Sequence, residues 1–141
     1  NIRIYIDHGL TTSIVKQLQK KVFCYTTSAK PLDIDYVYRG INLEPATIDA
    51  YKAARGRGSY RWLSFTSTTK NRQYAEFRGT NSLCIMFLKK LYGGSRASDI
   101  AWLSQFPEEE VLLQAGVGFQ VDDVIYNSES AQHTIYLTIF I

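Results

Sequence analysis

Residues 106–113 read Phe-Pro-Glu-Glu-Glu-Val-Leu-Leu: a proline turn leads into three consecutive carboxylates, which run directly into an apolar segment. Pro107 ends the preceding element because its ring fixes φ, and the apolar residues that follow are strand formers. If strand pairing begins near Glu109, then Glu108 and Glu110 point to one side of the strand, about 6–7 Å apart. Two carboxylates that close repel each other, which indicates a use for them at a core edge. The competing interpretation is a solvated acidic turn, since runs of charge usually face water.

Length and composition favour a single globular domain over residues 1–141. Of these residues 45% are hydrophobic and 21% are charged, which is ordinary for a soluble protein. No apolar run approaches the length needed to span a membrane. The chain starts Asn-Ile-Arg, with neither Met nor a signal-peptide pattern, which suggests a processed or excised piece of a longer protein.

The net charge and the few histidines and cysteines limit which ligands the protein is expected to bind. The net charge is +3 with scattered Lys and Arg, which does not fit a nucleic-acid footprint but suits a small ligand that bears phosphate. His8 and His133 have no partners at metal-ligand spacing, so no metal site is expected. Cys24 and Cys84 are compatible with one disulfide or with two buried thiols.

The apolar pattern predicts helices in the first half of the chain and strands in the second. Apolar residues recur every fourth position from Ile6 to Val22, which is a helical stripe. Asn42 is a candidate cap for a second helix, and Thr69 or Asn71 for a short third one. Without β-α-β alternation, the fold class is α+β with a mainly antiparallel sheet. We expect helices at residues 2–23 and 44–54, and a short third helix that carries Tyr74, Ala75 and Phe77 and is ended by Gly79. We expect strands at residues 36–41, 60–68, 83–88, 109–114, 119–126 and 134–141, and a short strand or turn at residues 98–102.

Two polar residues occupy strand positions where core residues are expected. Arg39 shares a strand face with apolar neighbours, and an inward arginine needs an anionic partner or a ligand. Gly40 leaves the adjacent backbone bare, so that a flat ligand can approach it. Ser67 places a hydroxyl at the end of the apolar face of the 60–68 strand. The alternatives are an edge-strand Arg39 that reaches water and a Ser67 that caps the next helix.

Three short motifs follow one another along the chain. They are Tyr-Arg-Gly at 38–40, Phe-Thr-Ser-Thr-Thr at 65–69 and Phe-Pro-Glu-Glu-Glu-Val-Leu at 106–112. In this order and spacing they resemble the Arg–Ser–Glu-x-Glu signature of the mono-ADP-ribosyltransferases. That family includes vertebrate ecto-enzymes and bacterial binary and exoenzyme toxins. The resemblance extends over residues 35–126, most of the chain.

The resemblance implies a role for each motif residue. Arg39 would hold the pyrophosphate and neighbouring ribose of NAD, and Gly40 would offer its backbone to the nicotinamide carboxamide. Ser67 would orient Glu110. Glu110 would grip the 2′-hydroxyl of the nicotinamide ribose and stabilise the cation that forms as nicotinamide leaves. Glu108 would accept the proton or hydrogen bonds of the incoming nucleophile, and in the family glutamate there goes with arginine as the target.

Other residues are assigned from the same resemblance. Thr68 and Phe77 would belong to the NAD site, Phe77 by stacking on nicotinamide. Trp102 and Phe106 would bound the stretch that recognises the acceptor. The chain departs from the family after Leu112, where relatives often continue Ile-Pro-Pro and this chain has Leu-Gln-Ala, which implies a differently shaped strand end.

The resemblance also implies a fold and an activity. The fold is α+β, with two packed, mainly antiparallel sheets, helices at the N-terminal side, and NAD in the cleft between the sheets. The expected activity is transfer of ADP-ribose from NAD to an arginine-bearing protein acceptor, without a metal. The alternatives are an NAD glycohydrolase that uses water and a silent domain that binds NAD or a protein. A secreted or cell-surface location is favoured by the resemblance alone, and the compartment, natural acceptor and oligomeric state stay open.

Overall fold

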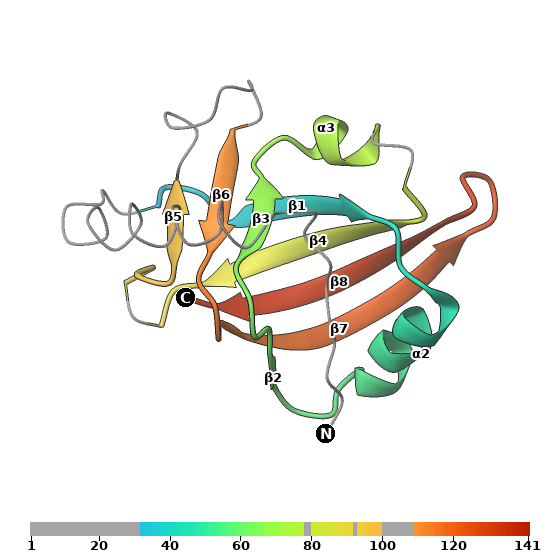
Figure 1. The fold of residues 1–141 in the computed structure, drawn as a ribbon, viewed down its shortest axis with the longest axis horizontal. Helices are drawn as coiled ribbons and strands as arrows, with labels where there is room; N and C mark the ends of the chain where they lie inside the picture. The colour runs from blue at the N-terminus through green and yellow to red at the C-terminus, as the bar shows by residue number, and fades with distance from the viewer. Residues whose placement is uncertain (1–31, 78–79, 92, 100–108) are drawn as a thin grey trace.

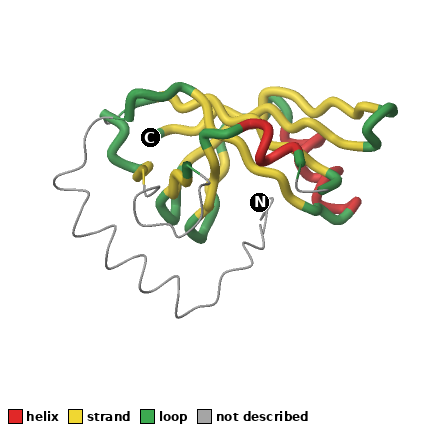
Figure 2. Tube along the Cα trace, turned by 90° about the horizontal axis from the view of Figure 1, so that it is seen from above, coloured by secondary structure: helices red, strands yellow, loops and turns green. Residues whose placement is uncertain are grey.

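The computed structural model describes residues 32–77, 80–91, 93–99 and 109–141. Most of this part of the chain is strand and loop (Figures 1 and 2). The helix expected at residues 2–23 lies outside the described residues. The helices are α2 (Pro45–Ala54) and α3 (Arg72–Glu76). The strands are β1 (Tyr36–Ile41), β2 (Tyr60–Arg61), β3 (Thr66–Thr69), β4 (Ser82–Lys89), β5 (Ala97–Asp99), β6 (Glu110–Leu113), β7 (Gly118–Asn127) and β8 (Gln132–Phe140).

The described strands form one sheet, in the order β2-β7-β8-β4-β1-β3-β6-β5. Strands β4 and β8 are parallel and the other neighbours are antiparallel, so the sheet is mixed but mainly antiparallel. The expected division into two separate sheets is not found among these strands. Strands β1 and β3 pair at Tyr38 and Thr69 only, which lets the sheet turn there. Figure 1 shows β3, β6 and β5 running across the direction of β1, β4, β8 and β7.

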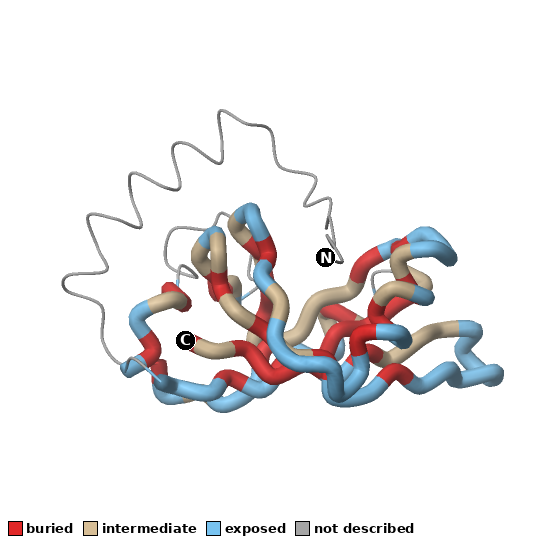
Figure 3. The backbone as a smooth tube through the Cα atoms, turned by 90° about the horizontal axis from the view of Figure 1, so that it is seen from below, coloured by how far each residue is buried: buried red, intermediate tan, exposed pale blue. Residues whose placement is uncertain are grey.

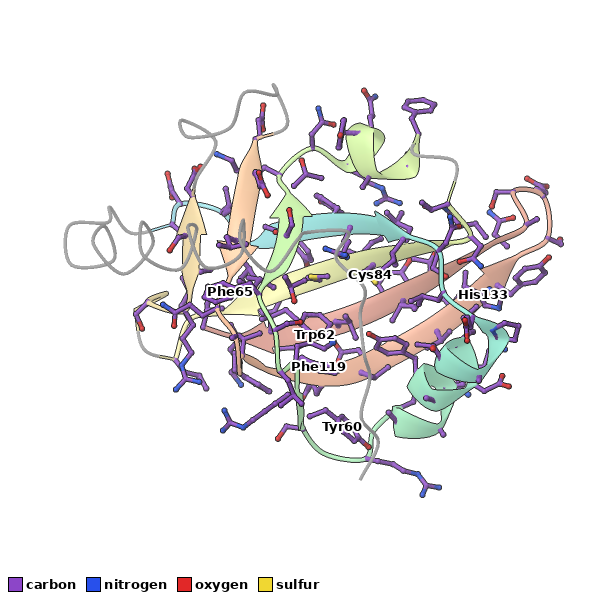
Figure 4. The ribbon with its side chains drawn as sticks, in the orientation of Figure 1. Tyr60, Trp62, Phe65, Cys84, Phe119 and His133 are labelled. Carbon is purple, nitrogen blue, oxygen red and sulfur yellow. The ribbon has the colours of Figure 1, made fainter. Side chains whose placement is uncertain are left out.

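The strand expected at residues 60–68 is interrupted. Tyr60 pairs with Phe119 on β7, whereas Thr66 pairs with Leu113 on β6. The two ends of this segment therefore belong to strands that lie far apart in the sheet. Between them Trp62 is 1% exposed and stacks on Phe119, with ring centroids 4.4 Å apart (Figure 4). The prediction of one continuous strand was wrong because the chain turns to bury this large indole in the core.

Both faces of the central strand β4 are buried. Cys84, Met86 and Leu88 face the main hydrophobic core, to which α2 also contributes. Leu83 and Ile85 face a smaller cluster that includes a residue of α3. Two buried faces explain why the sequence of β4 shows no polar alternation. Figure 3 shows buried residues along the strands and exposed residues at the turns.

One of the two predicted helix caps is confirmed. The side-chain oxygen of Asn71 accepts a hydrogen bond from a backbone N–H in the first turn of α3 at 3.1 Å. Helix α2 instead has Glu44 at its N-cap, without a side-chain hydrogen bond, and Pro45 in its first turn. The prediction for Asn42 was wrong, because its amide oxygen accepts the backbone N–H of Asn81, which precedes β4, at 2.9 Å.

Candidate active site

Three adjacent strands bring Arg39, Ser67 and Glu110 into one hydrogen-bonded row. They lie on β1, β3 and β6, which are consecutive in the sheet. Arg39 Nη1 donates to the backbone carbonyl of Ser67 at 2.6 Å, and Ser67 Oγ donates to Glu110 Oε1 at 2.5 Å. All three residues are half-buried, so each is partly packed against the protein and still reaches solvent. We call it the Arg–Ser–Glu row.

The register between β3 and β6 explains why Ser67 reaches Glu110. Thr69 lies opposite Glu110, and Ser67 lies opposite Leu112. Residues two apart on a strand share a face, so Ser67 and Glu110 are diagonal neighbours on that face. Because the hydroxyl donates to the carboxylate, Ser67 fixes the direction in which Glu110 points.

Arg39 lies on the core side of the sheet, as its strand position predicted. It pairs with Cys84 of β4 and shares a face of β1 with the buried Val37 and Ile41. Burial raises the pKa of the Cys84 thiol to about 12, and the nearby Arg39 charge opposes that rise without cancelling it. Burial also raises the pKa of Tyr51, on α2, well above its ordinary value. The guanidinium therefore lies beside a thiol and a phenol that stay neutral at physiological pH.

The missing side chain of Gly40 makes room for helix α3. A Cβ at Gly40 would lie 2.2 Å from the carbonyl oxygen of Ala75 and 3.0 Å from Oγ1 of Thr80. Because side chains alternate along a strand, this position faces away from Arg39. The space that the sequence analysis assigned to a flat ligand is taken, on this side of β1, by the backbone of α3.

Thr68 and Phe77, both predicted for the NAD site, have very different surroundings. Thr68 is 4% exposed, and its hydroxyl donates to the carbonyl of Val111 at 2.7 Å, which joins β3 to β6. Phe77 ends α3 and is 83% exposed. The Thr68 hydroxyl thus has a structural partner, whereas the Phe77 ring faces solvent.

Strand β6 begins at Glu110, and Glu109 precedes it in a left-handed conformation with φ +48°. The carbonyl of Glu109 accepts the backbone N–H of Lys70 at 3.1 Å. An extended chain through Glu109 was expected, and this expectation was wrong. The alternation of side chains from Glu110 therefore cannot be continued backwards. Three predicted residues lie outside the described part of the chain: Trp102, Phe106 and Glu108.

Lys70, which no sequence pattern predicted, links two segments beside the Arg–Ser–Glu row. Its Nζ lies 2.6 Å from Oδ2 of Asp99, at the end of β5, and its backbone N–H binds Glu109. No spacing rule connects these three positions. The available signal was that Lys70 directly follows the Thr-Ser-Thr-Thr motif.

Three further expectations can be compared with the described ranges. Cys84 is a free, buried thiol, and Cys24 lies outside these ranges. Within them, no three or more His, Cys, Asp or Glu side chains are grouped so that they could hold a metal ion. Among the same residues, no helix is both long and apolar enough to cross a membrane.

Comparison with known proteins gives matches among solved structures. No protein-family model matches the chain, and no curated protein sequence matches it. The ADP-ribosyltransferase HopU1 of Pseudomonas syringae pv. tomato DC3000 is 31% identical over 74% of this chain, with a TM-score of 0.63. The match covers 45% of HopU1, so this chain spans less than half the length of that protein.

Two C3-type proteins match more of this chain at lower identity. The one from S. aureus, solved with NAD, is 20% identical, with a TM-score of 0.64. The other, an ADP-ribosyltransferase from Clostridium botulinum, is also 20% identical, with a TM-score of 0.68. Each match covers 94% of this chain and 73% of the other protein. The strand order, the Arg–Ser–Glu row and these likenesses lead to one conclusion: the chain has the fold of the ADP-ribosyltransferases.

Proposed function

We propose that this chain transfers ADP-ribose from NAD to the side chain of an arginine in a protein acceptor and releases nicotinamide. The observation that supports this most is the Arg–Ser–Glu row, in which Arg39, Ser67 and Glu110 are hydrogen-bonded from three separate strands. A cation and an anion that both bind the same half-buried serine suit a substrate with negative phosphates and a sugar that becomes positive during reaction.

Arg39 is the residue that would bind the pyrophosphate of NAD. Its bond to the Ser67 carbonyl fixes one N–H of the guanidinium, and the planar fork suits phosphate oxygens. The neighbouring Cys84 and Tyr51 stay neutral, so neither of them offsets the guanidinium charge.

Glu110 is the residue that would stabilise the reacting sugar. The bond between C1′ of the ribose and the nicotinamide nitrogen breaks, its electron pair leaves with nicotinamide, and positive charge develops on the sugar. A carboxylate whose direction is fixed in advance stabilises that charge without reorganising, and Ser67 fixes Glu110 in this way.

Glu108 would complete the transfer to arginine. A guanidinium nitrogen of the acceptor forms the new bond to C1′, and the proton it loses passes to the Glu108 carboxylate. Trp102 and Phe106 would bound the surface that meets the acceptor. The choice of arginine over water rests on the glutamate at position 108 and on the motif resemblance.

The test is to incubate the protein with NAD and agmatine, a small arginine mimic, and to measure free nicotinamide and ADP-ribosylated agmatine. Glu110→Gln should lower both by about 10²–10³-fold, because a preorganised electrostatic group is lost. Glu108→Gln should abolish transfer and leave some NAD cleavage. Glu109→Gln is the matched control: this side chain is exposed, and the change keeps the backbone bond to Lys70.

Each outcome of this assay has a definite meaning. Nicotinamide release without labelled agmatine would show that water is the acceptor and would replace the transferase with an NAD glycohydrolase. No nicotinamide release by the unaltered protein would favour a silent domain. Equal loss of both products in Glu108→Gln would refute the separate roles given to Glu108 and Glu110.

A further inference from the structure

Lys70 holds two segments of the chain at the edge of the Arg–Ser–Glu row. Its ammonium lies 2.6 Å from the Asp99 carboxylate at the end of β5. Its backbone N–H donates to the carbonyl of Glu109, immediately before β6, at 3.1 Å. One residue therefore contacts the last described residue before the 100–108 stretch and the first described residue after it.

The strands around Lys70 place these contacts next to the proposed catalytic carboxylate. Lys70 directly follows β3, whose last residue, Thr69, pairs with Glu110. Asp99 pairs with Val111, so β5 and β6 are neighbours at the point where each meets the 100–108 stretch. The bond from Lys70 to Asp99 thus spans from β3, across β6, to β5.

The Lys70–Asp99 ion pair is only partly shielded from water. The side chains are 23% and 40% exposed, so salt weakens their attraction. The chain also offers a comparable ion pair away from this junction. Arg72 and Glu76 form an i,i+4 pair on α3 at 2.7 Å, with side chains 54% and 37% exposed.

We propose that Lys70 is a positioning residue for transfer to the acceptor. By holding Asp99 to the end of β3, its ammonium fixes one end of the chain that carries Glu108, while its backbone N–H fixes the other end. Glu110 keeps its own support from Ser67, so loss of the ammonium should reduce acceptor use more than NAD cleavage. This inference rests on the proposed transferase function.

The experiment compares Lys70→Met with Lys70→Arg and with the matched control Arg72→Met, using NAD and agmatine. Lys70→Met should lower the ratio of transfer to nicotinamide release by about two- to fivefold, mainly through a higher KM for agmatine. Lys70→Arg and Arg72→Met should keep the ratio of the unaltered protein. The exchanged pair Lys70→Asp with Asp99→Lys should recover most of the loss, because it restores the attraction in reverse.

The salt dependence of the ratio of transfer to nicotinamide release distinguishes a positioning role of Lys70 from a merely structural one. About 0.5 M NaCl should lower the ratio in the unaltered protein toward that of Lys70→Met, and should change the variant little. If Lys70→Met is poorly folded by thermal melting, Asp99→Asn removes the same attraction and gives the same test.

The two proposals fail in distinguishable ways. If the unaltered protein releases nicotinamide and labels agmatine, but Lys70→Met and Asp99→Asn keep its ratio, the role of Lys70 is refuted and the transferase stands. Equal loss of both products in Lys70→Met also refutes it. If the unaltered protein releases no nicotinamide, both the transferase function and the role of Lys70 fall.

Discussion

Gly40 shows how one absent side chain fixes the distance between a strand and a helix. The Ala75 carbonyl oxygen of α3 lies 2.2 Å from the place where a Cβ would be. That oxygen belongs to backbone, which cannot rotate away as a flexible side chain can. Gly40 therefore sets how closely α3, which leads to Phe77, packs on β1.

We predict that Gly40→Ala destabilises the protein by about 1–3 kcal/mol, because α3 must move away from β1 to admit the methyl group. Urea unfolding followed by circular dichroism measures this change. Gly118→Ala is the control, since a Cβ there would make an ordinary 3.5 Å contact with Phe140. Equal stability of the two variants would show that α3 yields without penalty.

Asn81 joins the loop between β1 and α2 to the start of β4 through its backbone and its amide group. Its Oδ1 accepts the backbone N–H of Leu43, and its Nδ2 donates to the carbonyl of Leu43, both at 2.8 Å. Its own backbone N–H donates to Asn42 at 2.9 Å. The segment between β1 and α2 is thereby held against the start of β4, although neither Asn42 nor Asn81 belongs to a helix or strand.

Asn81→Ala should lower the free energy of unfolding by about 1–3 kcal/mol, because it leaves both backbone groups of the buried Leu43 without these partners. Asn81→Asp retains the acceptor for the N–H and should lose less. Gln73→Ala, at an exposed position on α3, is the control and should change little. A loss in Asn81→Ala no larger than in the control would contradict the bridging role.

At the scale of the whole sheet, the Arg39 guanidinium lies near two groups of the main core that burial keeps neutral. Arg39 lies opposite Cys84, whose pKa burial raises to about 12, and burial also raises the pKa of Tyr51. Both groups are neutral when protonated, so the folded state binds their protons more tightly than the unfolded state does. Their contribution to stability is complete below their unfolded pKa values and is lost as pH rises toward the folded ones.

We therefore expect stability to fall as pH rises above about 8.5, the ordinary pKa of a cysteine. Between about pH 8 and pH 10, Cys84→Ala should remove up to about 2 kcal/mol of this fall, because alanine has no proton to lose. Urea unfolding at several pH values measures the slope. Identical slopes in the two proteins would show that the Cys84 thiol is not protected by burial.

The local sequence pattern was sufficient to predict those helices and strands that have a clear periodicity, cap or apolar run. The strand at residues 36–41 and the helices around 45–54 and 72–76 follow from periodicity, proline and the Asn71 cap. The buried central strand β4 follows from its unbroken apolar run. Local pattern failed at residues 60–68, because burial of Trp62 is decided by a distant partner, Phe119.

The sequence alone also supplied the identities and the order of Arg39, Ser67 and Glu110, because motif residues and their spacing are written in the chain. Only the tertiary structure decided how they meet. Arg39 and Ser67 are 28 positions apart in the sequence, and Ser67 and Glu110 are 43 apart. They meet because of how the strands pair, and no local sequence pattern specifies that pairing. The same holds for the single turning sheet and for Lys70 between Asp99 and Glu109, since long-range pairing depends on how all the strands pack together.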